Sequence, residues 1–248
     1  MPAHLPRLRV LWLPAIASML LVGTAAVRTT AQSPRADDRS PARAAYMRAH
    51  FGQAMELHDA VVRGHLDVAR AEAGRLAKHS PTVPMPVGAE AFQGRVTTLA
   101  REAAAARSLD DAARATASIL GTCGQCHRAM HVRAAVPVAP SPSVGGLVGH
   151  MLLHQRGMDM LLEGLVGPSD SSWGEGVRTL AGQSFAVDDA PRKLRGQMAR
   201  AEGQLAQLVG RAAQAHRTRD REEMYGRMLA TCGACHGSYA THAGPGKR

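Results

Sequence analysis

Two short cysteine motifs constrain this chain more than any other feature. They read Cys123-Gly-Gln-Cys126-His127 and Cys232-Gly-Ala-Cys235-His236, and they contain all four cysteines of the 248 residues. The pattern C-x-x-C-H is the attachment signature of a c-type haem. Two thiols three positions apart lie on one side of a helical turn, where both can form thioethers with the haem vinyl groups. The histidine that follows can then offer its imidazole to the iron as the proximal ligand.

Other cysteine chemistries fit the spacing less well. A four-cysteine zinc site usually has its two C-x-x-C pairs about 15–20 residues apart, whereas 105 residues separate Cys126 from Cys232. Two disulfides or a thioredoxin-like redox pair are possible in an oxidising compartment. However, C-x-x-C redox motifs open helices in βαβ folds, and no strand pattern precedes either motif. The sequence therefore predicts two covalently bound haem c groups, attached by Cys123, Cys126, Cys232 and Cys235, with His127 and His236 as proximal iron ligands.

The amino terminus has the pattern of a secretory signal peptide. Arg7 and Arg9 precede an uncharged, largely apolar stretch over 10–27, and the small-residue runs that end at Ala26 and Ala31 are acceptable cleavage sites. We expect residues 1–31 to be removed and the protein to be periplasmic, in agreement with haem attachment outside the cytoplasmic membrane of bacteria. An uncleaved segment would instead be an N-terminal membrane anchor, since about 18 apolar residues is the lower limit for a span.

The chain is basic, with 30 lysines and arginines against 20 acidic residues; removal of residues 1–31 leaves 27 against 20. The planar arginine fork suits pairing with haem propionates. A basic surface also steers acidic redox partners. No recognised nucleic-acid motif accompanies the charge, so nucleic acid is not an expected partner. We expect the partners to be other periplasmic redox proteins, including acidic ones, and membrane association only if the signal segment is uncleaved.

Composition and patterning predict an all-α fold. Aromatic residues make up only 3% of the chain, alanine is abundant, and runs of β-branched residues are absent. Helix starts are marked by Ser108 with Asp111 and by Ser172 with Glu175, both of which resemble capping boxes. The expected helices span 42–63, 66–79, 89–107, 109–131, 144–166, 172–183, 190–216 and 219–240. The proline-rich stretch over 136–142 indicates a linker.

An internal repeat divides the chain at this linker. Residues 59–77 align without gaps on 163–181, an offset of 104, and Met47-x-x-His50 falls on Met151-x-x-His154. The two C-x-x-C-H motifs are offset by 109. The predicted organisation is a signal peptide over 1–31, a haem-binding four-helix bundle over 42–131, a linker over 132–143, a second such bundle over 144–240 and a tail over 241–248.

The position of the motif in its domain distinguishes two cytochrome c architectures. In the class I fold the motif lies near the start of the domain, and in the other it lies on the last helix. Only 12 residues follow His236, so each unit carries its motif on its last helix. This resembles the class II cytochromes c, cytochrome c′ and its low-spin relatives. The resemblance is most specific at Cys232-Gly-Ala-Cys235-His236-Gly-Ser-Tyr239, which is similar to the C-x-x-C-H-x-x-Y ending of that family; Met130 replaces the tyrosine in the first unit. It implies a dihaem cytochrome c made of two tandem antiparallel four-helix bundles.

The second axial ligand of each iron decides the function. In an up-down-up-down bundle the end of the last helix lies beside the beginning of the first, so a distal ligand should come from 47–51 and from 151–154. His50 and His154 occupy equivalent repeat positions within the apolar stripes of their helices and are the first candidates. Met47 and Met151 are the alternatives, and an open coordination position is the third. In the class II family, cytochrome c′ has no sixth ligand, whereas the low-spin relatives use a methionine.

Other histidines are predicted to have no part in iron binding. His58 and Met158 also face inward but lie later in their helices. His58 is eight residues beyond His50, a rise of about 12 Å, which is too far for both histidines to reach one iron. His65, His131 and His150 are expected at the surface.

These features predict a periplasmic electron carrier rather than an enzyme, with no catalytic residues. A gas-binding or sensing protein with five-coordinate iron, as in cytochrome c′, is the alternative. A dihaem peroxidase-type enzyme is third, because it needs an open iron beside acid–base residues and the sequence identifies no such set.

Overall fold

The computed structural model describes residues 40–182 and 192–243. Within these ranges the chain forms eight α-helices and no strands, so the predicted all-α class is confirmed. The predicted signal peptide over 1–31 and the last residues of the predicted tail, 244–248, lie outside the described residues. Among the residues described, no helix combines the length and the apolar character that a membrane span requires.

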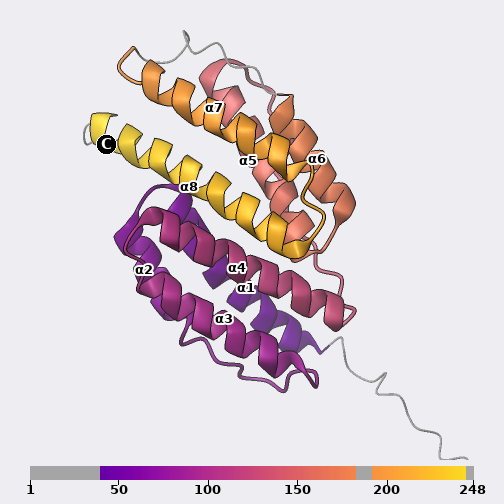
Figure 1. The fold of residues 1–248 in the computed structure, drawn as a ribbon. Helices are drawn as coiled ribbons and strands as arrows, with labels where there is room; N and C mark the ends of the chain where they lie inside the picture. The colour runs from indigo at the N-terminus through magenta and orange to yellow at the C-terminus, as the bar shows by residue number, and fades with distance from the viewer. Residues whose placement is uncertain (1–39, 183–191, 244–248) are drawn as a thin grey trace, which may run out of the picture. The chain divides into compact units, whose positions relative to one another are not determined.

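The helices follow the expected order, with bounds that differ from the predicted ones by a few residues (Figure 1). They are α1 (Pro41–Val62), α2 (Leu66–Leu76), α3 (Ala89–Ala104), α4 (Leu109–Ala129), α5 (Gly146–Val166), α6 (Asp170–Ala181), α7 (Arg195–Ala212) and α8 (Thr218–Ala243). Below, α1 to α4 are the first half of the chain, and α5 to α8 are the second half.

Of the two predicted helix starts, one is confirmed and one is wrong. Ser108 caps α4: its hydroxyl accepts the backbone N–H of Asp111 at 3.1 Å and contacts the Asp111 carboxylate at 2.8 Å. The later helix does not start at Ser172. Ser169 caps α6 by accepting the N–H of Ser172 at 3.1 Å, and Asp170 supplies the acidic first turn. A serine cap followed directly by an acidic residue interacts more favourably with the positive end of the helix dipole than the predicted start at Ser172 would.

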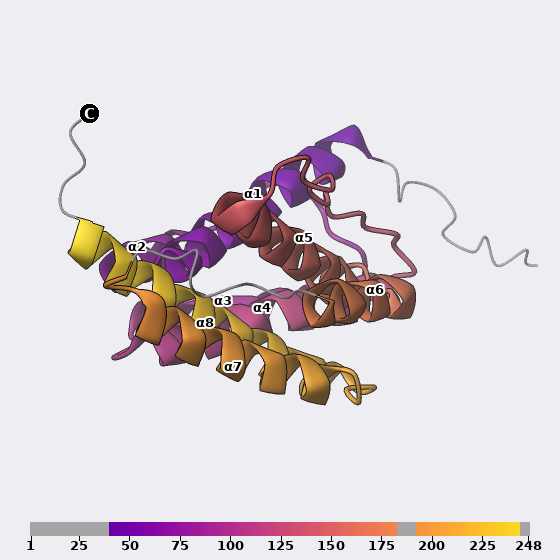
Figure 2. The ribbon, with the colours of Figure 1, turned by 90° about the horizontal axis from the view of Figure 1, so that it is seen from above.

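Four contacts between helices of the first half recur in the second half. In the first half α1 contacts α2 and α4, and α3 contacts α2 and α4; in the second half α5 contacts α6 and α8, and α7 contacts α6 and α8. Figure 2 shows α7 alongside α8. Further contacts join α4 to α8, α4 to α5 and α1 to α8, and all eight helices belong to one compact unit. The two motif-bearing helices therefore pack against each other (Figure 1).

Small residues allow α4 and α8 to come close. A Cβ on Gly226 of α8 would lie 3.2 Å from the Cβ of Ala117 and 3.2 Å from the Cα of Arg114. A Cβ on Gly121 of α4 would collide with the side chain of Glu222. Because Gly121 and Gly226 have no side chain themselves, the two helices can pack more closely than larger residues at these positions would permit.

Buried positions recur in the two halves at the offsets of the sequence repeat. Leu57 of α1 and Leu161 of α5 are fully buried and 104 residues apart. In α3 and α7, three further pairs are buried at an offset of 109, namely Val96 and Leu205, Ala100 and Val209, and Ala103 and Ala212. Corresponding helices thus bury corresponding faces.

The predicted linker is attached to the second half. Val136 is buried, the backbone N–H of Ala139 donates to Asp159 of α5 at 3.0 Å, and Arg156 of α5 bonds to the Ala139 carbonyl. Beyond these contacts Ser141 and residues 143–146 are exposed. The bundle boundaries at 132–143 stay a prediction.

Candidate functional site

Both C-x-x-C-H motifs lie on the last helix of their half, in the final turns of α4 and near the end of α8. None of the four cysteines is in a disulfide. Burial raises the pKa of both Cys123 and Cys232 to about 12, with the second cysteine of each motif adding to the effect. Redox-active C-x-x-C pairs have lowered thiol pKa values instead. The raised pKa of these thiols therefore does not favour a thioredoxin-like redox role.

A cavity of about 490 Å³ lies where the end of α4 meets the beginning of α1. Cys123, Cys126 and His127 line it from α4, and Met47 and His50 line it from α1. The volume falls within the range of about 300–1,000 Å³ that is usual for sites holding small molecules and cofactors. The structure therefore brings together all of the residues predicted for the first site.

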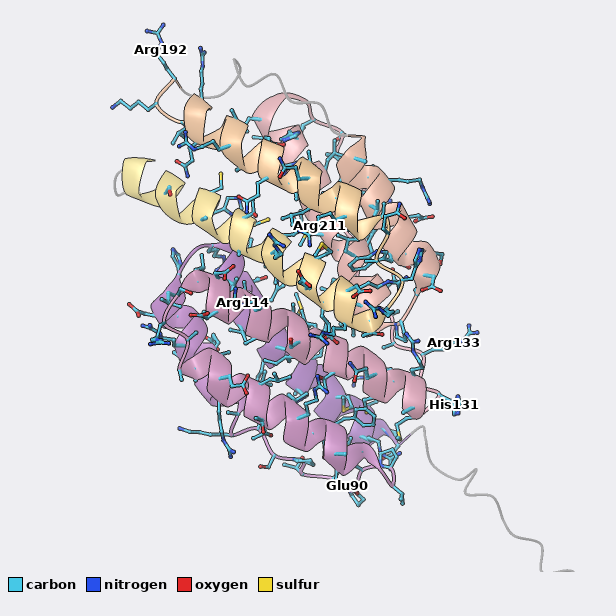
Figure 3. The ribbon with its side chains drawn as sticks, in the orientation of Figure 1. Glu90, Arg114, His131, Arg133, Arg192 and Arg211 are labelled. Carbon is cyan, nitrogen blue, oxygen red and sulfur yellow. The ribbon has the colours of Figure 1, made fainter. Side chains whose placement is uncertain are left out.

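The wall of this cavity is apolar and its charged residues are all basic. Phe51, Phe92 and Met85 contribute to the wall, and Arg43, Arg48 and Arg133 are the charged side chains among the described lining residues. Figure 3 shows Arg133 just beyond the end of α4. Sequence patterns gave no sign of Met85, which lies in the proline-rich connection before α3, or of Phe92. Such a lining suits a flat apolar ligand with anionic groups.

His127 is oriented by a backbone carbonyl of the second half. Its Nδ1 lies 2.8 Å from the carbonyl oxygen of Val166, the last residue of α5. A carbonyl only accepts hydrogen bonds, so Nδ1 carries the proton and donates it. In the neutral ring the lone pair is then on Nε2, the nitrogen that can bind a metal.

His236 has the equivalent arrangement in reverse. Its Nδ1 lies 2.9 Å from the carbonyl oxygen of Val62, the last residue of α1. The two acceptors, Val62 and Val166, are 104 residues apart and thus occupy the same repeat position. Both motif histidines therefore present Nε2 for metal binding, and in each case the acceptor belongs to the opposite half.

His50, the first distal candidate, belongs to a stack of three rings. Its Nδ1 lies 3.0 Å from Nδ1 of His79, and its ring centroid is 5.7 Å from that of Tyr46 and 5.2 Å from that of His79. Burial, followed by the repulsion of His79, lowers the pKa of His50 to about 4. The ring is therefore neutral at pH 7, as a metal ligand must be.

His154, the second distal candidate, lies in a cluster with His150 and Glu202. One carboxylate oxygen of Glu202 on α7 is 2.9 Å from Nε2 of His150, and the other is 3.6 Å from Nε2 of His154. Among the described residues, these three bring potential ligand atoms within 4.8 Å of one another, an arrangement that could hold a metal ion. The predicted surface position of His150 is wrong: the residue is buried, because Glu202 supplies the polar partner that burial requires.

Two electrostatic effects link this cluster to the second motif. Burial lowers the pKa of His154 to about 4; Glu202 opposes the shift, and His150 and His236 add to it. Burial raises the pKa of Cys235, and the Glu202 carboxylate adds to that shift. The charges of the cluster and of the second motif are therefore close enough to influence one another.

The two sites differ at equivalent positions. His150 corresponds to Tyr46 at the offset of 104, and Glu202 corresponds to Gln93 at the offset of 109. Gln93 lines the first cavity. The second site thus has a carboxylate where the first has an amide, so the two sites are electrostatically unlike.

The remaining predicted residues occupy distinct places. Met47 shares the first cavity with His50, and Met151 is half-buried on α5. His58 and Met158 are buried, as their inward-facing positions predicted. His65 and His131 are exposed, as predicted.

Comparisons of the chain with protein-family models, with curated proteins and with solved structures gave no significant match. The functional interpretation therefore depends on the residues of the two sites. The residues of the first site can be compared with what a haem requires. They provide two thiols, a histidine with Nε2 free to bind, an apolar cavity of suitable size and basic side chains. These residues fit the group.

Proposed function

We propose that this chain is a periplasmic dihaem c-type cytochrome that carries electrons. The observation that carries the proposal is the first cavity, where the whole C-x-x-C-H motif meets His50. In this proposal each half is an antiparallel four-helix bundle with one haem on its last helix, as the resemblance to class II cytochromes c implies. The contacts among the four helices of the first half, and among the four helices of the second half, support that arrangement.

The motif residues would hold the cofactors. Cys123 and Cys126 attach the first haem and Cys232 and Cys235 the second, each through two thioethers. His127 and His236 would bind iron through Nε2, since Nδ1 donates to a carbonyl. The haem iron, when bound, supplies a centre that accepts and releases one electron.

The distal residues of the chain decide whether small molecules reach the iron. His50 and His154 are neutral at pH 7 and can serve as second axial ligands. Met47 and Met151 are the alternatives on the same helices. A second protein ligand closes the coordination sphere and favours electron transfer over the binding of exogenous ligands.

Basic residues at the first cavity would hold the charged edge of the cofactor. Arg48 and Arg133 are exposed and can pair with propionates while they remain at the surface. Together with the positive net charge of the chain, they would also attract an acidic redox partner.

Intact-mass measurement after export with a haem-maturation system tests this function. The cleaved chain should carry two haem additions. A variant with Cys123→Ser and Cys126→Ser should carry one, and so should the matched variant with Cys232→Ser and Cys235→Ser. A haem-free chain with stoichiometric zinc would overturn the proposal and would leave His150, His154 and Glu202 as the residues to examine for metal binding.

A further inference from the structure

We propose that each haem site of this chain is completed by the opposite half, through a glycine inside each C-x-x-C-H motif. Gly124 and Gly233 are positioning residues: they let the last turn of the opposite half's first helix reach the motif histidine. This inference rests on the proposed function, because it assigns the glycines a role toward the haem-binding histidines.

Each glycine lies where the backbone of one half comes close to the backbone of the other. A Cβ on Gly124 would be 2.0 Å from the carbonyl oxygen of Leu165, and a Cβ on Gly233 would be 2.3 Å from that of Val61. Side-chain carbons do not come this close to backbone oxygens, and a backbone oxygen inside a helix moves only with its helix. Any larger residue at either position would push α5 away from α4, or α1 away from α8.

The close approach and the hydrogen bond lie on the same helix face. In each motif the glycine precedes the histidine by three residues, a spacing that places both on one side of the helix. Opposite them, Leu165 precedes the acceptor Val166, and Val61 precedes the acceptor Val62. The absence of a Cβ at the glycine therefore brings the next carbonyl within 2.8–2.9 Å of the histidine Nδ1.

This contact between a motif of one half and the first helix of the other half occurs twice, at the offsets of the sequence repeat. The two glycines are 109 residues apart and the two acceptors 104, as are the equivalent positions elsewhere in their helices. At the second site Gly64, with φ of 78°, adds a further contact: a Cβ there would lie 2.5 Å from the carbonyl oxygen of Gly233. The end of α1 is thus closely packed against the motif of α8.

These contacts would make the reduction potential of each haem depend on the opposite half. An imidazole that donates Nδ1–H to a carbonyl is a more basic ligand, and a more basic ligand stabilises ferric over ferrous iron. Loss of the contact at Gly124 should therefore raise the reduction potential of the first haem only. Loss of the contact at Gly233 should raise that of the second haem only.

Potentiometric titration of the full chain tests this with Gly124→Ala and Gly233→Ala. We expect each variant to shift one midpoint to a more positive value and to leave the other in place, with the two variants affecting different haems. Gly94→Ala and Gly203→Ala are matched controls, because a Cβ at either glycine meets no atom within 4 Å; both midpoints should stay unchanged. Folded Gly124→Ala and Gly233→Ala proteins with wild-type midpoints would overturn the inference.

A second measurement needs no substitution at the glycines. A protease recognition sequence inserted after Ser141, in the exposed part of the linker, allows the matured chain to be cut between the halves. The fragments should co-elute in gel filtration, and in rising urea both midpoints should shift at the concentration where the fragments separate. Fragments that separate with both midpoints unchanged would overturn the inference.

The same cut chain separates failure of this inference from failure of the proposed function. If mass measurement finds no haem, the proposed function fails. The packing at the glycines is still tested, because Gly124→Ala and Gly233→Ala should then separate the fragments at lower urea than the two control variants do.

Discussion

The Nε2 atom of His58 lies 3.0 Å from the hydroxyl oxygen of Tyr225, a residue 167 positions later in the chain. The bond joins α1 of the first half to α8 of the second, and both side chains are buried. Burial raises the pKa of Tyr225 well above its usual value, so the hydroxyl keeps its proton. It donates to Nε2, because the carboxylate beside the other ring nitrogen only accepts and so requires the ring proton on Nδ1. On the other side of the ring, Nδ1 of His58 lies 3.3 Å from the Asp59 carboxylate.

Replacement of Tyr225 by phenylalanine should destabilise the protein. The change leaves Nε2 of His58 buried without a partner, which costs about 1–3 kcal/mol. Urea unfolding measures the loss. The double variant His58→Leu with Tyr225→Phe is the matched control, since Leu162 occupies the position equivalent to His58; it should recover part of the loss. A single variant as stable as the wild type would show that the bond contributes nothing.

Replacement of His50 by alanine should open the first haem alone, and His154→Ala the second alone, because each candidate lies at its own site. About half of the iron should become high-spin in each variant, with the other haem unchanged. EPR and optical spectra of the oxidised protein, with carbon monoxide binding to the reduced form, measure this.

The wild-type spectrum is the control for this test. High-spin iron at both haems of the wild-type protein would contradict the histidine ligation and favour gas binding. Low-spin iron unaffected by both substitutions would point to Met47 and Met151.

Replacement of Arg48 by glutamine should lower the midpoint potential of the first haem. A positive charge at the cavity disfavours the more positive ferric state, so its removal stabilises that state. Redox titration at low salt measures the shift. Arg101→Gln changes an exposed arginine of α3 that does not line the cavity, and it should have a smaller effect. Equal shifts in the two variants would show only a change in net charge.

Replacement of Glu222 by glutamine should stabilise the protein at pH 7. Burial raises the pKa of Glu222, whose carboxylate accepts a hydrogen bond from Gln125 at 3.0 Å. The folded state thus holds this proton more tightly than the unfolded state does, so stability falls as the pH rises from the ordinary pKa of 4.5 through the raised value. The neutral amide avoids this loss and can still accept the bond from Gln125.

Thermal unfolding between pH 4 and pH 8 tests the Glu222 prediction. The variant should have the higher Tm at pH 7, and the difference should shrink as the pH falls toward 4.5. A difference in Tm that does not change with pH would mean that the titration of Glu222 plays no part. Glu223→Gln, at an exposed carboxylate of the same helix, is the matched control.

The sequence predicted the helices because their bounds depend on local patterns, and it predicted that His50 meets the first motif because the order of the helices brings them together. Helix bounds follow from caps such as Ser108 and from the prolines between helices, and the meeting of His50 with Cys123 follows from the order of antiparallel helices. The contact between α4 and α8 was not predictable in this way. It depends on glycines and alanines, among them Gly226 and Ala117, whose side chains are absent or small.

Partners that come from another helix were also missed. The burial of His150 requires Glu202 of α7, and the stack around His50 requires His79 from the connection after α2. A helical wheel shows one helix at a time, so it identifies neither partner. The carbonyls of Val62 and Val166 are backbone groups and leave no sequence signal at all.

The paired contacts of His127 with Val166 and of His236 with Val62 have the form of an isologous interface, in which one patch meets its own equivalent. A single repeat could satisfy the same contacts only by pairing with a second copy, at a rate and an occupancy set by concentration. Joining the two copies in one chain makes the pairing intramolecular and nearly independent of dilution. The two halves can also differ at equivalent positions, as they do at Gln93 and Glu202, so that the two proposed haem sites can have different potentials.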